Sequence, residues 1–229
     1  ESTMTDTLAR IEFADGTTWL QRLTPQAPAA LIPARPSAWS VAGTYLGLGV
    51  EHILLGIDHL LFVLALLLLT RGTWRLVKTV TAFTVAHSIT LALAALGVVH
   101  VPQAPVEAVI ALSIVFVAAE ILRARAGREG IAARAPWIVA FAFGLLHGFG
   151  FAGALAQTGL PEGHIPLALL FFNLGVEAGQ LLFIAAVLSA IALIRNVRFT
   201  LPRWSASVTP YAIGSLAMFW VIQRVAAFQ

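Results

Sequence analysis

The sequence has no cysteine and few charged residues. Of its 229 residues, 11% are Asp, Glu, Lys or Arg, compared with about 25% in a typical soluble domain. Without cysteine the chain can form no disulfide, no thiolate metal site and no thiol nucleophile. Only two methionines occur, Met4 and Met218, which argues against a thioether-lined path for Cu(I). The chain also has no P-loop, so ATP-driven transport by this chain alone is not expected.

Apolar residues are abundant instead. Hydrophobic residues make up 59% of the sequence, and the mean hydropathy is +0.88, which indicates an integral membrane protein. The net charge is +3, and the Lys and Arg residues stand in short connections between apolar segments, where they set membrane topology. We therefore expect the lipid bilayer as a partner and no nucleic acid.

Six apolar segments predict an all-α fold, a polytopic transmembrane helix bundle with about six membrane-spanning helices. The first and fifth segments exceed the roughly 20 residues that a straight span needs, so we expect tilt, a break or an extension into water there. Gly47, Gly49 and Gly56 would allow bends in the first segment. The segments cover residues 43–69, 75–98, 105–122, 136–157, 164–194 and 208–227.

Residues 1–38 are the only stretch with soluble character. Residues 9–23 alternate in hydropathy on either side of Asp15-Gly16, which predicts two short strands and a turn. Four prolines then predict an extended linker, and the stretch is too small for a core of its own. We expect residues 1–38 to be an extracytoplasmic arm, or the remnant of an N-terminal domain plus its linker. Residues 39–229 would form the transmembrane helical domain.

Positive charge alternates between the connections. Lys and Arg crowd the first, third and fifth connections, at residues 71–78, 123–134 and 195–203. They are absent from the second and fourth, at 100–104 and 158–164. The positive-inside rule places the charged connections in the cytoplasm and both termini outside.

Four ionisable side chains lie within the first apolar segment: Glu51, His52, Asp58 and His59. A charge at mid-membrane costs roughly 2.5–3.5 kcal/mol, so such residues usually mark a functional site. On a continuous helix, residues seven apart lie only about 20° from each other. The histidines would form one stripe and the carboxylates the next, with Gly56 leaving room for an ion or a neighbouring helix. This pattern favours ligands for a divalent metal, and the alternative is a polar seam between helices.

Three further segments place polar residues near the estimated midplane. His87 in the second segment and His147 in the fourth are candidate ligands or relays. In the fifth, Asn173, Glu177 and Gln180 share one helix face, where a hydrogen-bonded seam is again the alternative. Because polar residues from four helices fall at one depth, we predict a shared buried site.

Other ionisable residues are weaker candidates. Glu107 suits a helix start, where a carboxylate complements the helix dipole. Glu120 can reach Arg123 or the membrane interface. His100 and His164 lie in or beside the outer connections, where we expect ordinary solvated side chains.

Several of these motifs resemble the HupE/UreJ family of nickel transporters. His52, followed after five residues by Asp58-His59, looks like the signature of that family. The resemblance covers about residues 43–195 and implies a multi-pass protein of the bacterial inner membrane that passes Ni²⁺ or another divalent metal. Further matches, similar to the second branch of the family, are Phe83–Ser88, Phe143–Gly148 and Phe172–Glu177.

These observations favour a permease for a divalent transition metal over an enzyme. Ni²⁺ is the favoured ion, with Co²⁺ and Zn²⁺ as alternatives. The rival hypothesis is an intramembrane zinc-dependent hydrolase that uses a His/Asp site and the Ser88 hydroxyl. A metal sensor, or a membrane anchor for an N-terminal domain, is a further alternative. A homo-oligomer is possible with any of these functions. The predicted metal site comprises His52, Asp58, His59, His87, His147, Glu177, Asn173 and Glu51.

Overall fold

The computed structural model describes residues 7–12, 18–24, 29, 37–128, 130–158, 163–195 and 205–228. Within them the chain forms two strands and eight helices. The chain divides into two compact units, Glu1–Pro36 and Ser37–Gln229, and the division falls close to the domain boundary predicted after residue 38. The second unit carries every candidate metal ligand.

The N-terminal unit contains two antiparallel strands, β1 (Thr7–Glu12) and β2 (Thr18–Leu23). Ile11 lies opposite Trp19 in the register, so the predicted pair of short strands is confirmed. The turn expected at residues 15–16 lies outside the described residues. The role of this unit as an extracytoplasmic arm or domain remnant stays a prediction.

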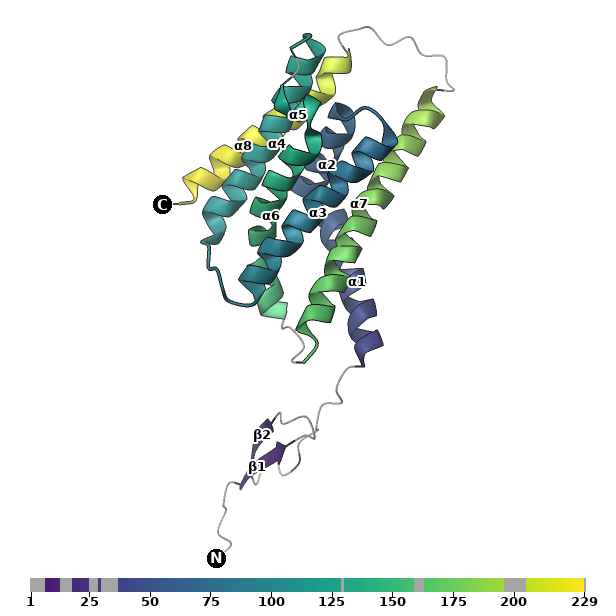
Figure 1. Ribbon diagram of the computed structural model, residues 1–229. Coiled ribbons are helices and arrows are strands. Elements are labelled where there is room, and N and C mark those ends of the chain that lie inside the picture. Colours follow the sequence, from purple (N-terminus) through teal and green to yellow (C-terminus); the bar gives the residue numbers. More distant parts are fainter. Residues whose placement is uncertain are drawn as a thin grey trace, which may run out of the picture. The chain divides into compact units, whose positions relative to one another are not determined.

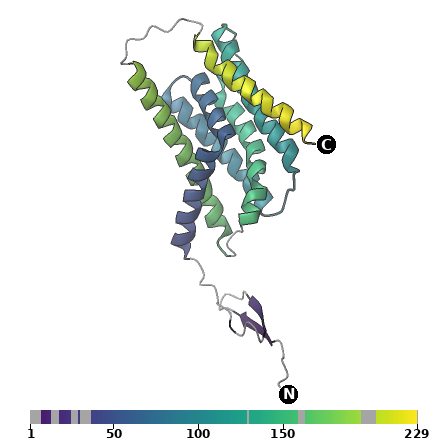
Figure 2. The ribbon, with the colours of Figure 1, turned by 180° about the vertical axis from the view of Figure 1, so that it is seen from behind.

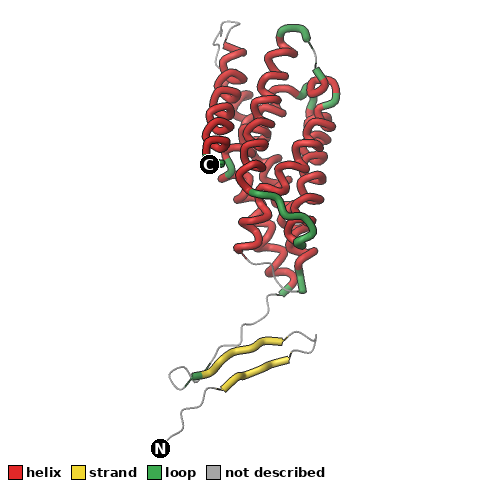
Figure 3. Tube along the Cα trace, turned by 90° about the vertical axis from the view of Figure 1, so that its left-hand side faces the viewer, coloured by secondary structure: helices red, strands yellow, loops and turns green. Residues whose placement is uncertain are grey.

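The second unit is a helix bundle, as the all-α prediction expected (Figure 1). Helix bounds agree with the predicted apolar segments to within a few residues at most ends, and the long helices run along one common direction (Figure 3). The helices are α1 (Ala38–Leu55), α2 (Ile57–Leu69), α3 (Thr73–Ala95), α4 (Gln103–Arg125), α5 (Ile131–Arg134), α6 (Pro136–Thr158), α7 (Ile165–Arg195) and α8 (Ser205–Ala226).

The helices have the length and hydropathy of a polytopic membrane protein. Among the described residues, α3, α4 and Ile165–Ile194 of α7 are each long and apolar enough to cross a membrane, and α1 with α2 adds a fourth span if the bent pair counts as one. The described apolar part of α6, Pro136–Phe151, is shorter. Large apolar side chains such as Leu182, Phe219 and Ile222 are exposed on the bundle, as suits contact with lipid.

The first predicted span is broken at Gly56. α1 and α2 meet there at 75°, and Gly56 has an extended backbone conformation with ψ 93°. Helical backbone hydrogen bonds of 3.0 Å continue up to the break on both sides. The Gly56 N–H donates to the His52 carbonyl at the end of α1, and the Leu60 N–H donates to the Gly56 carbonyl at the start of α2. Of the three alternatives expected for this long segment, namely tilt, a break or an extension into water, the structure shows a break. The assumption of one continuous helix, on which the histidine stripe was based, is wrong.

Glycines allow two helix pairs to approach closely. α1 lies beside α7 (Figures 1 and 2), and a Cβ on Gly175 would lie 3.0 Å from the Cα of Gly49. Both glycines belong to a Leu-Gly-Val-Glu tetrapeptide, so the two copies of this sequence meet. α3 and α6 pack in a similar way, because a Cβ on Gly144 would lie 2.5 Å from the Phe83 carbonyl oxygen. Small residues at such contacts are typical of membrane helix pairs.

The two ends of the bundle differ in charge. The connection between α2 and α3 and the segment around α5 lie at one end, and the connection between α3 and α4 lies at the other (Figure 1). Arg71, Arg75, Arg125 and Arg134 all line one cavity at the first end. The predicted alternation of charge along the chain therefore becomes a separation in space. The assignment of the basic end to the cytoplasm stays a prediction.

Candidate metal site

Four imidazoles from four helices meet inside the bundle. They belong to His52 on α1, His59 on α2, His87 on α3 and His147 on α6. The ring centroids of His52 and His59 are 4.6 Å apart, those of His59 and His147 are 5.4 Å apart, and those of His52 and His87 are 6.3 Å apart. His52 is half-buried and the other three are buried. The structure thus brings together these four residues, which the sequence placed in three separate segments.

The break at Gly56 accounts for the contact between His52 and His59. In a straight helix, seven residues rise by about 10.5 Å, whereas these two ring centroids are only 4.6 Å apart. The bend of 75° brings the rings together. A Cβ on Gly56 would lie 2.8 Å from Nδ1 of His59, so this glycine makes room for the His59 ring itself.

The tautomer of His87 follows from its hydrogen-bond partner. Nδ2 of Asn173 donates to the Leu169 carbonyl at 2.8 Å, which turns Oδ1 of Asn173 toward Nδ1 of His87 at 3.1 Å. An amide oxygen can only accept, so Nδ1 of His87 carries the proton and donates it. Nε2 therefore keeps its lone pair, and this atom is buried without a hydrogen-bond partner.

The tautomer of His147 also follows from its hydrogen-bond partner, but here Nε2 rather than Nδ1 carries the proton. The hydroxyl of Ser113 donates its proton to the Ile110 carbonyl at 2.6 Å, and its oxygen lies 3.0 Å from Nε2 of His147. Because the hydroxyl proton is already used, Nε2–H of His147 is the donor to Ser113. Nδ1 of His147 is left with a lone pair and has no hydrogen-bond partner.

Buried imidazole nitrogens without partners are concentrated in this cluster. Besides the atoms of His87 and His147, they include Nε2 of His52 and both ring nitrogens of His59. One nitrogen each from His52, His59 and His87 can be chosen so that all three lie within 4.8 Å of one another. A buried polar atom without a partner costs about 1–3 kcal/mol. A divalent metal that accepts imidazole ligands would satisfy several of these atoms at once.

Phenylalanines surround the imidazoles. The ring centroid of Phe151 lies 4.0 Å from that of His52, and Phe151 also stacks on Phe172 at 4.9 Å. On the other side, Phe62 and Phe83 lie 5.0 and 5.1 Å from the ring of His147. An apolar shell of this kind limits access of water and lowers the local dielectric constant, which controls how a site treats a charged ligand.

A protein-family model described as HupE / UreJ protein, the second of that name, matches residues 28–224. The chain belongs to the HupE/UreJ family. No curated protein and no solved structure matches the chain. This match confirms the family resemblance inferred from the sequence motifs. The matched region contains all eight predicted metal-site residues.

In this HupE/UreJ protein, Asp58 bonds to an arginine rather than to the imidazoles. Its Oδ2 accepts a hydrogen bond of 2.7 Å from Nη2 of Arg224 on α8. Nε of Arg224 also lies 3.8 Å from Oε2 of Glu107, and its Nη1 donates to the Glu107 backbone carbonyl at 2.8 Å. Arg224 thus lies between two carboxylates and joins α8 to α2 and α4.

The polar residues of α7 divide between two roles. Asn173 orients His87, as described above, whereas Glu177 accepts a hydrogen bond of 2.6 Å from Thr81. Gln180 accepts one of 3.0 Å from Thr84. Glu177 and Gln180 therefore form a polar seam between α7 and α3, which is the alternative considered for this face. Glu51 is exposed and does not belong to the histidine group within 4.8 Å.

Arg224 and Ser113, which bond to Asp58 and His147, were not among the sequence candidates. Arg224 lies in the sixth apolar segment, and the cost of a charge there was a sufficient signal to single it out. Ser113 offered no comparable signal, because a lone serine in a span commonly bonds to its own helix. Among the weaker candidates, Glu120 pairs with Arg123 at 3.3 Å, as expected, and His100 is exposed.

Proposed function

We propose that this protein moves a divalent transition metal, with Ni²⁺ as the first candidate, across the membrane through the imidazole cluster. Two observations carry the proposal. His52, His59 and His87 can each place one ring nitrogen within 4.8 Å of the others, and each of these rings has a buried nitrogen without a hydrogen-bond partner among the described residues. Membership of the HupE/UreJ family supports it, because that resemblance implies transport of nickel or a related divalent metal.

The spacing of the nitrogens suits an ion that is bound briefly. In tetrahedral coordination with metal–nitrogen distances of 2.0–2.1 Å, ligand nitrogens lie about 3.3 Å apart. The three nitrogens here lie within a wider limit of 4.8 Å, so the imidazoles must approach one another to enclose one ion. Neutral imidazoles also leave the double charge of the ion uncompensated. A transport site needs such moderate affinity, because an ion that enters must also leave.

His147 extends the cluster beyond these three ligands. Its ring lies 5.4 Å from that of His59, and Ser113 keeps its Nδ1 available as a ligand. We propose that an ion held by His52, His59 and His87 passes to a second ligand set that includes His59 and His147. Asn173 would act by orienting the His87 ring. Asp58 and Glu177 would not bind the ion directly and would act through their hydrogen-bond partners, Arg224 and Thr81.

The direction of the path follows from the charge of the two bundle ends. We propose that the arginine-rich end faces the cytoplasm and that both termini lie outside, as the positive-inside rule implies. Metal would then enter from the side on which α1 begins and move toward the basic end.

The zinc hydrolase hypothesis has less support. Such an enzyme needs a group that can accept a proton from the zinc-bound water. Asp58 is bonded to Arg224, and Glu177 is bonded to Thr81. The Ser88 hydroxyl donates to the Thr84 carbonyl at 2.7 Å. These groups are therefore engaged elsewhere.

The decisive test measures Ni²⁺ flux into liposomes that contain the purified protein and an internal metal-sensitive dye. We expect the wild type to conduct Ni²⁺ and the His59→Ala and His87→Ala variants to lose most of the flux. His100→Ala removes an exposed loop histidine and is the matched control, which should retain flux within about twofold. A folded wild-type protein that binds Ni²⁺ but produces no flux would overturn the permease and favour a sensor or an enzyme.

A further inference from the structure

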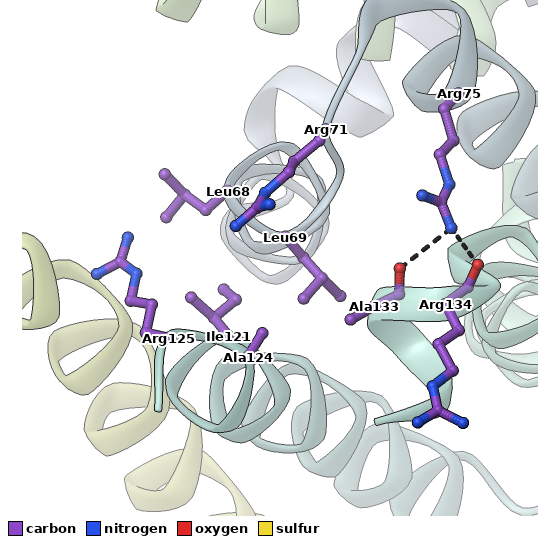
Figure 4. Close-up of a pocket in the computed structure, with 9 residues that line it drawn as sticks. All are labelled: Leu68, Leu69, Arg71, Arg75, Ile121, Ala124, Arg125, Ala133 and Arg134. Carbon is purple, nitrogen blue, oxygen red and sulfur yellow. Dashed lines mark hydrogen bonds between the residues drawn. The ribbon is translucent and has the colours of Figure 1, made fainter. Parts of the chain in front are cut away.

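A cavity of about 420 Å³ opens at the basic end of the bundle, between the end of α2, the end of α4 and α5 (Figure 4). Four arginines line it, namely Arg71, Arg75, Arg125 and Arg134, over an apolar floor that includes Leu69 and Ile121. No carboxylate is among the described residues that line it. The volume is within the range of small-molecule sites.

One of these arginines has a structural role in the fold. Nη2 of Arg75 donates to the Ala133 carbonyl at 3.1 Å and also to the Arg134 carbonyl. These are the last carbonyls of α5, which have no partner within the helix. Arg75 therefore caps α5, although its remaining N–H groups stay available, since a guanidinium has five.

Arg71 and Arg125 have no such partner. Neither forms a hydrogen bond or ion pair with the described part of the chain. In Figure 4 they extend toward the same side of the cavity from two different elements, whereas the guanidinium of Arg134 points away from Leu69 and Ile121. A location near helix C-termini accounts for some positive charge, at about 0.3–1 kcal/mol for each residue. It does not account for two guanidinium groups that line one cavity and have no partner among the described residues.

We propose that this cavity binds a phosphate group, with Arg71 and Arg125 as its main partners and Arg75 as a third donor. Guanidinium groups match phosphate oxygens in geometry and can donate two parallel hydrogen bonds. The apolar floor beneath the arginines fits the glycerol and acyl portion of an anionic phospholipid, as in basic pockets between membrane helices. A free phosphate ion offers the same charge without the apolar portion. This inference does not depend on the proposed metal transport.

The test compares ligands by the rise in the thermal unfolding temperature of the purified protein in neutral detergent. The ligands are dioctanoyl phosphatidylglycerol, dioctanoyl phosphatidylcholine and inorganic phosphate, at equal concentrations. We expect a clear rise with phosphatidylglycerol and little with phosphatidylcholine. In Arg71→Gln and Arg125→Gln, the concentration of phosphatidylglycerol that gives half the rise should increase about fivefold, which corresponds to roughly 1 kcal/mol for each arginine.

Arg128→Gln is the matched control, because Arg128 is exposed near the same end, does not line the cavity and carries the same charge. The proposal requires this variant to respond as the wild type does. A rise of equal size with inorganic phosphate would support phosphate binding and identify the free ion as its source. Equal responses of all three arginine variants, or equal responses to both lipids, would overturn the site. Each variant's unfolding temperature without ligand shows that it is folded, and the two single variants test the site independently.

Discussion

Arg224 lies between Asp58 and Glu107, so removing the arginine and removing one carboxylate should have unequal effects. Asp58→Asn leaves Arg224 paired with Glu107, and the remaining pair is neutral. Arg224→Gln leaves two carboxylates facing each other without a counter-charge. The double variant leaves only Glu107. We therefore expect Arg224→Gln to destabilise the folded state more than Asp58→Asn does, and the double variant to be more stable than Arg224→Gln.

The size of the effect can be worked out from the geometry. Two unit charges about 4 Å apart attract by about 4 kcal/mol at an effective dielectric constant of ~20. The side chains of Arg224 and Asp58 are each 23% exposed, so solvent screening reduces this to a coupling of about 2–3 kcal/mol. Glu107 is 43% exposed and lies at 3.8 Å, and its pairing adds less than about 1 kcal/mol.

The assay is a double-mutant cycle on the purified protein, with the free energy of unfolding measured in detergent for the wild type, both single variants and the double variant. Ni²⁺ binding is measured on the same samples. Because Oδ2 of Asp58 is bonded to Arg224, we expect the double variant to bind Ni²⁺ within about fivefold of the wild type. The sequence places Asp58 among the predicted metal ligands, and the cycle separates loss of a ligand from loss of the ion pair.

Two results would refute this reasoning. A coupling energy near zero would show that the contact between Asp58 and Arg224 does not stabilise the fold. A double variant that is stable but binds no Ni²⁺ would show that Asp58 itself serves as a ligand or as the charge that attracts the metal.

Three further predictions concern the site and its orientation. Gly56→Ala should weaken Ni²⁺ binding by about tenfold or more in a titration, because its Cβ would lie 2.8 Å from Nδ1 of His59. Gly47→Ala has nothing within 4 Å of its Cβ, and a similar loss in that control would contradict the explanation. Ni²⁺ affinity should fall as the pH drops from about 7.5 to 5.5, because a protonated imidazole has no lone pair to offer; calorimetry that gives a constant affinity would argue against histidine ligands. In this cysteine-free chain, single cysteines at Gly127 and Gly159 should react with an impermeant reagent from opposite sides of the membrane, and reaction from one side would rule out the proposed topology.

The helices of the bundle were predictable because membrane spans carry a strong local signal. Runs of about 20 apolar residues need no tertiary information to be recognised, and the ends of α3, α4 and α7 differ from the predicted ends by only a few residues. A shared site that includes His52, His59, His87 and His147 was also predictable, because each of these residues is costly in the membrane interior.

The pairing of polar residues between helices was not predictable in the same way. Sequence spacing shows which residues share a face of one helix, but not which helix covers that face. Asp58 was expected among the metal ligands, and only the packing of α8 against α2 shows that Arg224 reaches it. Likewise, the roles of the ring nitrogens of His147 depend on Ser113, which α4 contributes.

The break at Gly56 also determines the electrostatics of the site. It ends α1 at Leu55, so His52 stands in the last turn of that helix, where the negative end of the helix dipole favours a cation. It also starts α2 at Ile57 and places Asp58 in the first turn of that helix, where its carboxylate pairs with Arg224. A continuous helix would offer neither terminus at this depth, and it would hold His52 and His59 about 10.5 Å apart along its axis. Broken helices serve ion sites in transporters for the same reason. Both the geometry and the charge of the proposed site therefore depend on one interruption in the first span.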